Sequence, residues 1–306
     1  MSKRRQRPTE LDDPRLLPTY VGMALFKLIG KLPLNLLLVM GRGLGHLLWP
    51  VVRERRNVAL KNIQLCFPEL PPAAQYALAK AAFISTGEAL LEMAAFFSND
   101  HLDLDARLTV RGLHHLQQAQ QHGRGVLFIG MHFNSIDAGC RLISKIVPLN
   151  AVYRPNNNIA MDRLIQAHRT RFAEQAIDRK DIRRMVRALR QGKVLWYAPD
   201  QDYGTNNAVF VPFFGVPAAT ITATSRLAKM GNAVVLPIAH YRYPGGKYRI
   251  EIGAPLSNFP SGDDHQDTAL INTTIEHYVR QQPEQYLWVH KRFKHQPDGI
   301  SPYKSN

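Results

Sequence analysis

The chain has few cysteines and few acidic residues. Only Cys66 and Cys140 are present, far apart and without C-x-x-C spacing. This pattern excludes a disulfide framework and a thiolate metal site, and it is typical of a protein facing the reducing cytoplasm. Asp and Glu number 24 against 39 Lys and Arg, so the formal net charge is +15. Such an imbalance favours an anionic partner: nucleic acid, a membrane surface, a phosphorylated substrate or an acidic protein.

A long uninterrupted apolar run is also missing. Residues 16–52 are mostly apolar, but the longest uncharged runs are 16–26 and 32–41. Each is too short to span a hydrocarbon core of roughly 30 Å alone. No small-x-small cleavage site follows, which argues against a cleavable signal peptide. Basic residues at 3–7 and 53–56 flank the segment, so we expect membrane attachment rather than a buried helical hairpin. Whether the segment spans the membrane or lies flat on it stays open at this point.

The 306 residues, of which 45% are hydrophobic and 21% charged, are enough for one large folded domain plus an appendage. Helical patterns at 57–67 and 72–97 are followed, from about residue 107, by short β-prone runs that alternate with helices. The β-prone runs are Val126–Ile129, Ala151–Tyr153, Val194–Tyr197, Val234–Ile238 and Tyr248–Ile252. This alternation predicts an α/β fold with a mostly parallel sheet flanked by helices. We therefore predict two parts: residues 1–55 as a basic N-terminus with a membrane-anchoring helical segment, and residues 56–306 as an α/β catalytic domain.

Two helices of the α/β part have recognisable ends or charges. One is predicted to begin after the N-cap Asp181 and to stop at Gly192. It carries Arg183, Arg184, Arg187 and Arg190. These arginines could contact nucleic-acid phosphates, but no recognised nucleic-acid motif accompanies them and a solvated helix face explains them equally well. The other helix is predicted over 159–175.

The strand 126–129 ends at Gly130 and is followed by His132 and, five residues on, Asp137. Ligands of α/β proteins gather beyond the carboxyl ends of strands. Five helical residues turn through about 500°, so the two side chains can meet only if His132 lies in the loop before a helix. Asp137 could then hold one imidazole nitrogen, leaving the other to take a proton from a substrate hydroxyl. The alternative is a capped helix start with an incidental histidine.

Other chemistry is less favoured at this position. No G-x-S-x-G elbow surrounds Ser135, which argues against a nucleophilic serine. No second His, Asp or Glu stands near His132 at a ligand spacing, so we expect no metal site.

Further candidates each have a structural alternative. Arg154, at a strand end, could grip a phosphate or carboxylate, or lie in a plain surface turn. Asp200 and Asp202 could orient a basic group or an acceptor hydroxyl, or they could simply stabilise the turn after a strand, where Asp is favoured. The aromatic run 210–215 suits an acyl-chain channel or a buried core. The basic aromatic segment 285–294 could lie at a membrane interface or pack across the domain.

Several short blocks occur in order along nearly the whole chain. They are Arg56-Asn57-Val58, residues 65–69, His132…Asp137, residues 153–156, 178–181, 196–200 and 283–286. Together they resemble the late acyltransferases of lipid A biosynthesis, within the wider glycerolipid acyltransferase superfamily. The resemblance implies a bacterial inner-membrane enzyme with an N-terminal anchor, its catalytic domain on the cytoplasmic face of an anionic membrane, and no cofactor. It further implies transfer of a fatty acyl chain from acyl carrier protein to a Kdo-bearing lipid A precursor, and no nucleic-acid partner.

Carried over by position, the resemblance makes His132 the general base and Asp137 its orienting acid, and it places Arg169 and Asp200 in the active site. Together with Arg154 at its strand end, we expect Arg169 and Asp200 to bind substrate. The charge that develops on the thioester carbonyl would then be stabilised by backbone amides at the helix start or by Arg169. Lauroyl-type relatives commonly carry glutamate where Asp137 stands, whereas the myristoyl-type branch can carry aspartate. The other matched positions favour the lauroyl type. A myristoyl-type enzyme and a glycerolipid (lysophosphatidic acid) acyltransferase are the alternatives.

Overall fold

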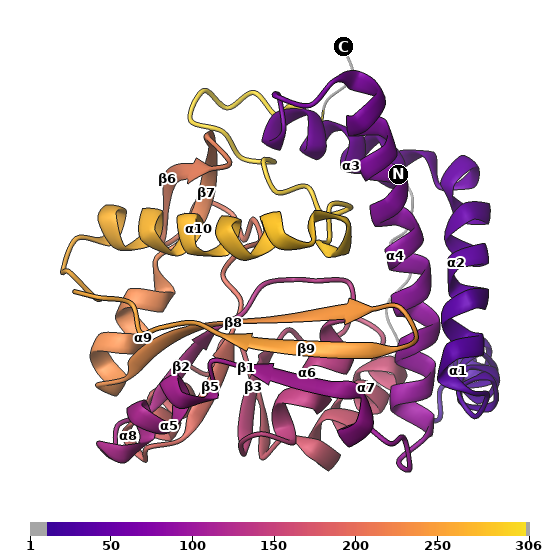
Figure 1. The fold of residues 1–306 in the computed structure, drawn as a ribbon, viewed down its shortest axis with the longest axis horizontal. Helices are drawn as coiled ribbons and strands as arrows, with labels where there is room; N and C mark the ends of the chain where they lie inside the picture. The colour runs from indigo at the N-terminus through magenta and orange to yellow at the C-terminus, as the bar shows by residue number, and fades with distance from the viewer. Residues whose placement is uncertain (1–10, 304–306) are drawn as a thin grey trace.

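The computed structural model describes residues 11–303, so the predicted basic run at 3–7 lies outside the described residues. A seven-stranded sheet forms its centre, in the order β1-β9-β8-β2-β5-β3-β4 (Figure 1). The strands are β1 (Leu108–Arg111), β2 (Val126–Ile129), β3 (Leu149–Tyr153), β4 (Gln175–Asp178), β5 (Val194–Tyr197), β8 (Val234–Tyr243) and β9 (Lys247–Ile252). Strands β8, β2, β5, β3 and β4 run parallel, while β9 is antiparallel to β8 and parallel to β1. The predicted α/β fold with a mostly parallel sheet is confirmed.

Helices cover both faces of this sheet. They are α5 (Leu113–Gln121), α6 (Ile136–Ser144), α7 (Ile159–Phe172), α8 (Ile182–Arg190), α9 (Ala223–Gly231) and α10 (Asp264–Gln281). Helix α3 (Arg53–Cys66) packs on other helices and adds Ala59, Ile63 and Cys66 to the core. Side chains of α8, α9 and α10 pack in the core on one face, and those of α5 and α6 pack in the core on the other. The hairpin β6 (Ala208–Phe213) and β7 (Val216–Ile221) pairs outside the main sheet and packs against α10.

The apolar runs became strands because they are buried from both sides, as parallel strands usually are. All of β2 is buried, and its predicted bounds and those of β5 agree with the structure. The N-cap prediction also holds, since the Asp181 side chain accepts a hydrogen bond from the backbone N–H of Arg184. Gly192 has a φ of +74°, which suits glycine at a helix end. The helix predicted over 159–175 is too long, because Gln175 already opens β4.

The N-terminal helices α1 (Leu17–Ile29) and α2 (Leu34–Val51) pack along α4 (Pro72–Ser98) and stand beside it at one end of the sheet (Figure 1). Helices α2 and α4 touch backbone to backbone. A Cβ at Gly45 would lie 2.5 Å from the Ile84 Cα, and one at Gly87 would lie 2.4 Å from the Gly41 carbonyl oxygen. Only glycine allows this approach. The predicted boundary at 55/56 falls within α3, and the two-part division stays a prediction.

The outward side of α1 and α2 is apolar. Its exposed side chains are Leu17, Val21, Leu25, Leu28, Leu36, Val39, Met40, Leu47 and Val51. We call these nine residues the apolar outer face. Among the described helices, α2 and α4 are long and apolar enough to cross a membrane, and 28% of the α2 window against 56% of the α4 window is buried in the protein. Helix α4 therefore serves largely as a core helix, whereas α2 leaves most of its apolar surface uncovered.

Candidate active site

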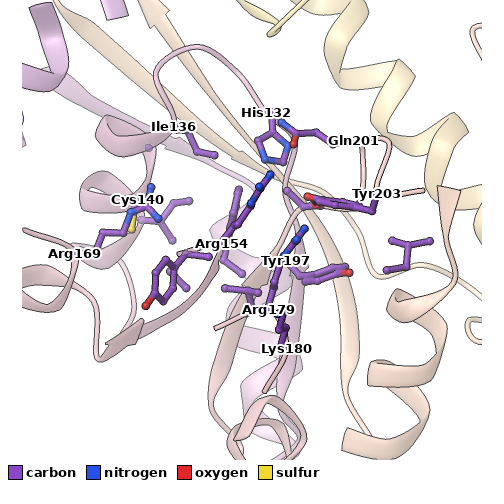
Figure 2. Close-up of a pocket in the computed structure, with 18 of the residues that line it drawn as sticks. His132, Ile136, Cys140, Arg154, Arg169, Arg179, Lys180, Tyr197, Gln201 and Tyr203 are labelled. Carbon is purple, nitrogen blue, oxygen red and sulfur yellow. Dashed lines mark hydrogen bonds between the residues drawn. The ribbon is translucent and has the colours of Figure 1, made fainter. Parts of the chain in front are cut away.

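A cavity of about 670 Å³ opens at the carboxyl ends of the parallel strands, where sites of α/β proteins gather (Figure 2). It receives His132 from the loop after β2, Arg154 after β3, and Arg179 with Lys180 after β4. One face of α6 forms another wall. The sequence placed His132 and Arg154 at strand ends, and the fold brings those two ends together.

The loop that carries His132 is fixed by its surroundings. A Cβ at Gly130 would lie 2.2 Å from Nε1 of Trp196, so the strand can turn here only with glycine. On the other side the loop is bonded to a distant segment: the Asn134 N–H donates to the Gln285 carbonyl at 2.7 Å, and the Leu287 N–H donates to the His132 carbonyl at 3.0 Å. We call residues 285–287 the clamp segment. It holds the loop from outside the sheet.

The imidazole of His132 is oriented by Asp200. Nδ1 of His132 lies 2.5 Å from Oδ1 of Asp200, and the backbone N–H of His132 donates to Oδ2 at 2.8 Å. Burial alone would raise the pKa of the fully buried Asp200, but the charge of His132 and its hydrogen bonds outweigh this and leave the pKa below its usual value. The carboxylate is therefore ionised and accepts the Nδ1 proton, which leaves Nε2 of His132 as the nitrogen able to act as a base.

The structure corrects the predicted pairing of His132 with Asp137. Asp137 lies in the first turn of α6 as expected, but its Oδ1 is 2.8 Å from Nη2 and 3.2 Å from Nε of Arg169. It lines a separate cavity of about 170 Å³ that does not include His132. The helical rotation carries the Asp137 side chain away from the imidazole and toward α7, whose last turn supplies the arginine.

The predicted role of Asp200 in binding substrate is also corrected. Asp200 is fully buried and does not line the cavity, so it contacts His132 rather than a ligand. Arg154 and Arg169 do line the cavity, and Figure 2 shows the Arg154 side chain reaching toward His132.

Two cations that were not singled out as site residues line the same cavity. Arg179 lies with its guanidinium 5.3 Å from the centre of the Tyr203 ring, and Lys180 follows it. Within residues 11–303, neither these two nor Arg154 has a carboxylate partner. The apolar part of the lining includes Ile136, Cys140, Ile143, Ala151, Trp196 and Ile221. The cavity therefore suits a ligand with both a hydrocarbon and an anionic part.

Two open alternatives are decided by packing. In the aromatic run, Phe213 and Phe214 are buried in the core and do not line the cavity, so the core interpretation is right. The segment 285–294 packs across the domain, where Asn62 donates from its side-chain amide to the carbonyls of Trp288 (2.6 Å) and His290 (2.7 Å).

Asp202 holds a second histidine in the same way. Nδ1 of His295 lies 2.7 Å from Asp202 Oδ1, and its backbone N–H donates to Oδ2 at 3.0 Å. His295 does not line the cavity, so this pair fixes the position of the chain near its end.

Within the described range, no cluster of three or more metal-ligating side chains occurs.

Comparison with known proteins adds the family. The family described as bacterial lipid A biosynthesis acyltransferase matches residues 4–295. The chain is 37% identical to the lipid A biosynthesis lauroyltransferase of Escherichia coli, over 95% of this chain and 96% of that protein. It is 36% identical to the palmitoleoyltransferase of the same organism, over 94% of each chain, and 30% identical to its myristoyltransferase, over 95% and 91%. A solved lysophosphatidic acid acyltransferase from Thermotoga maritima aligns at a TM-score of 0.37 with 15% identity, over 82% of this chain and 95% of that one.

The family match and the Escherichia coli relatives define an acyltransferase. The chain belongs to the bacterial lipid A biosynthesis acyltransferase family, and the resemblance found in the sequence blocks is confirmed.

Proposed function

We propose that this enzyme transfers a lauroyl chain from acyl carrier protein to the hydroxyl of a hydroxyacyl chain on the Kdo-bearing lipid A precursor, with His132 as general base. The observation that carries the proposal is the pair of hydrogen bonds by which Asp200 holds His132 at the wall of a cavity lined by both apolar and cationic side chains.

In the proposed reaction, Nε2 of His132 takes the proton from the acceptor hydroxyl, and the oxygen attacks the carbonyl carbon of the thioester. The C–S bond breaks, and the leaving sulfur takes up the proton from His132, which returns the imidazole to its neutral form. A thiol with a pKa of about 8.5 is a good leaving group, so no covalent enzyme intermediate is required. General base assistance of this kind is typically worth about 10²- to 10⁴-fold in rate.

The positive charge of the site supports anionic substrates. Arg154, Arg179 and Lys180 are available for a phosphate, whether on the lipid A precursor or in the arm of the carrier. The formal net charge of +15 suits an acidic carrier protein and an anionic membrane. The higher identity to the lauroyl- and palmitoleoyltransferases than to the myristoyltransferase supports the lauroyl-type branch. The myristoyl-type and glycerolipid activities are the alternatives.

The test is a competition assay. The full-length protein is incubated with a tetraacylated Kdo-bearing precursor and equal amounts of lauroyl, myristoyl and palmitoleoyl carrier protein. The products are identified and quantified by mass spectrometry. We expect a lauroyl group to be added in excess over the others. The same chains as coenzyme A thioesters should react at least tenfold more slowly. A myristoyl product would support the alternative branch, equal rates with coenzyme A would contradict the carrier as donor, and acylation of lysophosphatidic acid in place of the precursor would contradict the proposed function.

We also propose that the apolar outer face attaches the enzyme to the cytoplasmic leaflet of the inner membrane. Burying one leucine-sized side chain contributes about 1.5–3 kcal/mol, and nine such side chains face outward together on α1 and α2. The arginines that begin α3 follow directly and suit anionic headgroups.

Charges placed on the apolar outer face should release the enzyme from lipid. For the double variant Leu25→Glu/Val39→Glu we expect at least a tenfold drop in the fraction that floats with vesicles containing anionic phospholipid. The control is Leu270→Glu, which places the same charge at an exposed leucine on α10, away from this face. Flotation of the double variant at the wild-type level would contradict membrane attachment through these helices.

A further inference from the structure

His240 is a second histidine at the cavity. It lies on β8, which pairs with β2 through Pro237 and Ile129, so His240 stands beyond that pairing and beside the loop that follows β2. Its ring contacts Phe133 edge to face, at 5.5 Å between ring centres. His240 and His132 line the same cavity.

The His240 ring is held in one place. A Cβ at Gly139 of α6 would lie 2.6 to 2.8 Å from its ring atoms, so glycine at this position lets the helix pack directly on the imidazole. Phe133 confines it from the loop side. A donor fixed in this way needs no reorganisation when charge develops near it, which is the condition for electrostatic catalysis.

One nitrogen of this ring lacks a partner. His240 is 4% exposed, and its Nε2 is buried without a hydrogen-bond partner among residues 11–303. Buried polar groups are nearly always paired. Because the His240 residue lines the cavity, its unpaired nitrogen indicates a group that a bound ligand can complete.

The ring stays neutral at physiological pH. Burial lowers the pKa of His240 to about 4, and the charges of His132 and Arg242 act in the same direction. A neutral imidazole carries one N–H and does not compete with His132 for the substrate proton.

The backbone N–H groups of the loop itself are already engaged. The backbone N–H groups of His132, Phe133 and Asn134 donate to Asp200, Met131 and Gln285 respectively. The Arg169 guanidinium is paired with Asp137. Arg169, which was predicted to stabilise the thioester oxygen, is therefore already held by Asp137, and this leaves room for a dedicated donor.

We propose that Nε2–H of His240 donates a hydrogen bond to the thioester carbonyl oxygen as that oxygen becomes negative in the transition state. The inference rests on the proposed function and assigns a further catalytic residue to it. As the acceptor oxygen bonds to the carbonyl carbon, the carbonyl π electrons move to the oxygen that His240 binds. They return when the C–S bond breaks, and the sulfur takes up the proton that His132 removed. His132 thus transfers the proton of the acceptor hydroxyl, and His240 stabilises the negative charge on the carbonyl oxygen.

The test compares His240→Gln with His240→Met, two side chains of similar size of which only glutamine has an N–H donor. We expect His240→Met to lower kcat by about 10²- to 10³-fold with KM for both substrates within a few fold, and His240→Gln to retain activity within about tenfold of wild type. His168→Met is the matched control: His168 is also a buried histidine with an unpaired ring nitrogen, but it does not line the cavity. Wild-type kcat in His240→Met, or an equal loss in the Gln and Met variants, would overturn the proposal.

A binding measurement on the wild-type enzyme covers the case in which a variant fails to fold. An amide analogue of the donor, which keeps the carbonyl, should shift the ¹⁵N resonance of His240 Nε2, whereas a thioether analogue without the carbonyl should not. No shift with bound amide analogue would reject the role of His240. Failure of the wild-type enzyme to acylate the lipid A precursor would instead reject the proposed function, so the two failures are distinguishable.

Discussion

His132→Ala should reduce turnover by about 10²- to 10⁴-fold or more, because the reaction loses the only base that the proposed mechanism uses. The protein should stay folded, since the imidazole is partly exposed at the cavity wall and the backbone N–H of residue 132 can still donate to Asp200. The measurement is the rate of acyl transfer from carrier protein to the lipid A precursor, together with the thermal unfolding midpoint.

The chain supplies a matched control for this variant. His295 is held by Asp202 through the same pair of contacts, ring Nδ1 and backbone N–H, but stands outside the cavity. His295→Ala should therefore keep near-wild-type activity. Equal losses in the two alanine variants would mean that the His–Asp contact matters only for folding, and wild-type turnover in His132→Ala would exclude it as the base.

Asp200→Asn should lower kcat by roughly 10²- to 10⁴-fold, the range set by base catalysis and by loss of the orienting acid in the serine-protease triad. The carboxylate accepts two hydrogen bonds from one residue, and an amide can accept only at its oxygen. The amide NH₂ group would then face the ring Nδ1 or the backbone N–H. In the first arrangement the tautomer with a free Nε2 is no longer fixed, and in the second the loop loses the backbone contact that positions the ring.

Asp137→Asn is the informative comparison. It removes the charge paired with Arg169 on α7, so we expect a lower unfolding midpoint and a smaller loss of kcat than for Asp200→Asn. Kinetics of both variants at one pH, with their melting curves, decide between the two acids. A larger kcat loss for Asp137→Asn than for Asp200→Asn would restore Asp137 as the orienting acid.

The parts of the fold that the sequence predicted were those with strong local signals. β2 and β5 are continuous apolar runs, and α8 has an acidic N-cap and a glycine end. β4 was missed because Gln175–Asp178 is half polar and follows α7 after a very short connection. β6 and β7 were missed because hairpin pairing outside the main sheet depends on tertiary packing with α10.

Part of the candidate site was predicted, since His132, Arg154 and Arg169 line the cavity, but the pairing of His132 with its acid was not. Local sequence places His132 in a loop and Asp137 in the first turn of a helix, and both positions are observed. Which acid reaches the ring depends on how β5 aligns beside β2, a contact between residues 68 positions apart. Asp200 rather than Asp202 contacts His132 because of the register between β2 and β5, and short sequence motifs do not determine that register. His240 carried no motif at all, and its position follows from the pairing of β8 with β2.

The clamp segment has a consequence for synthesis of the enzyme. Ribosomes make the loop with His132 long before residues 285–287, whose backbone groups hold it on its outer side. A growing chain that has finished all the parallel strands still lacks this support. The loop with the proposed base is therefore held on this side only once residues 285–287 have been made, late in translation.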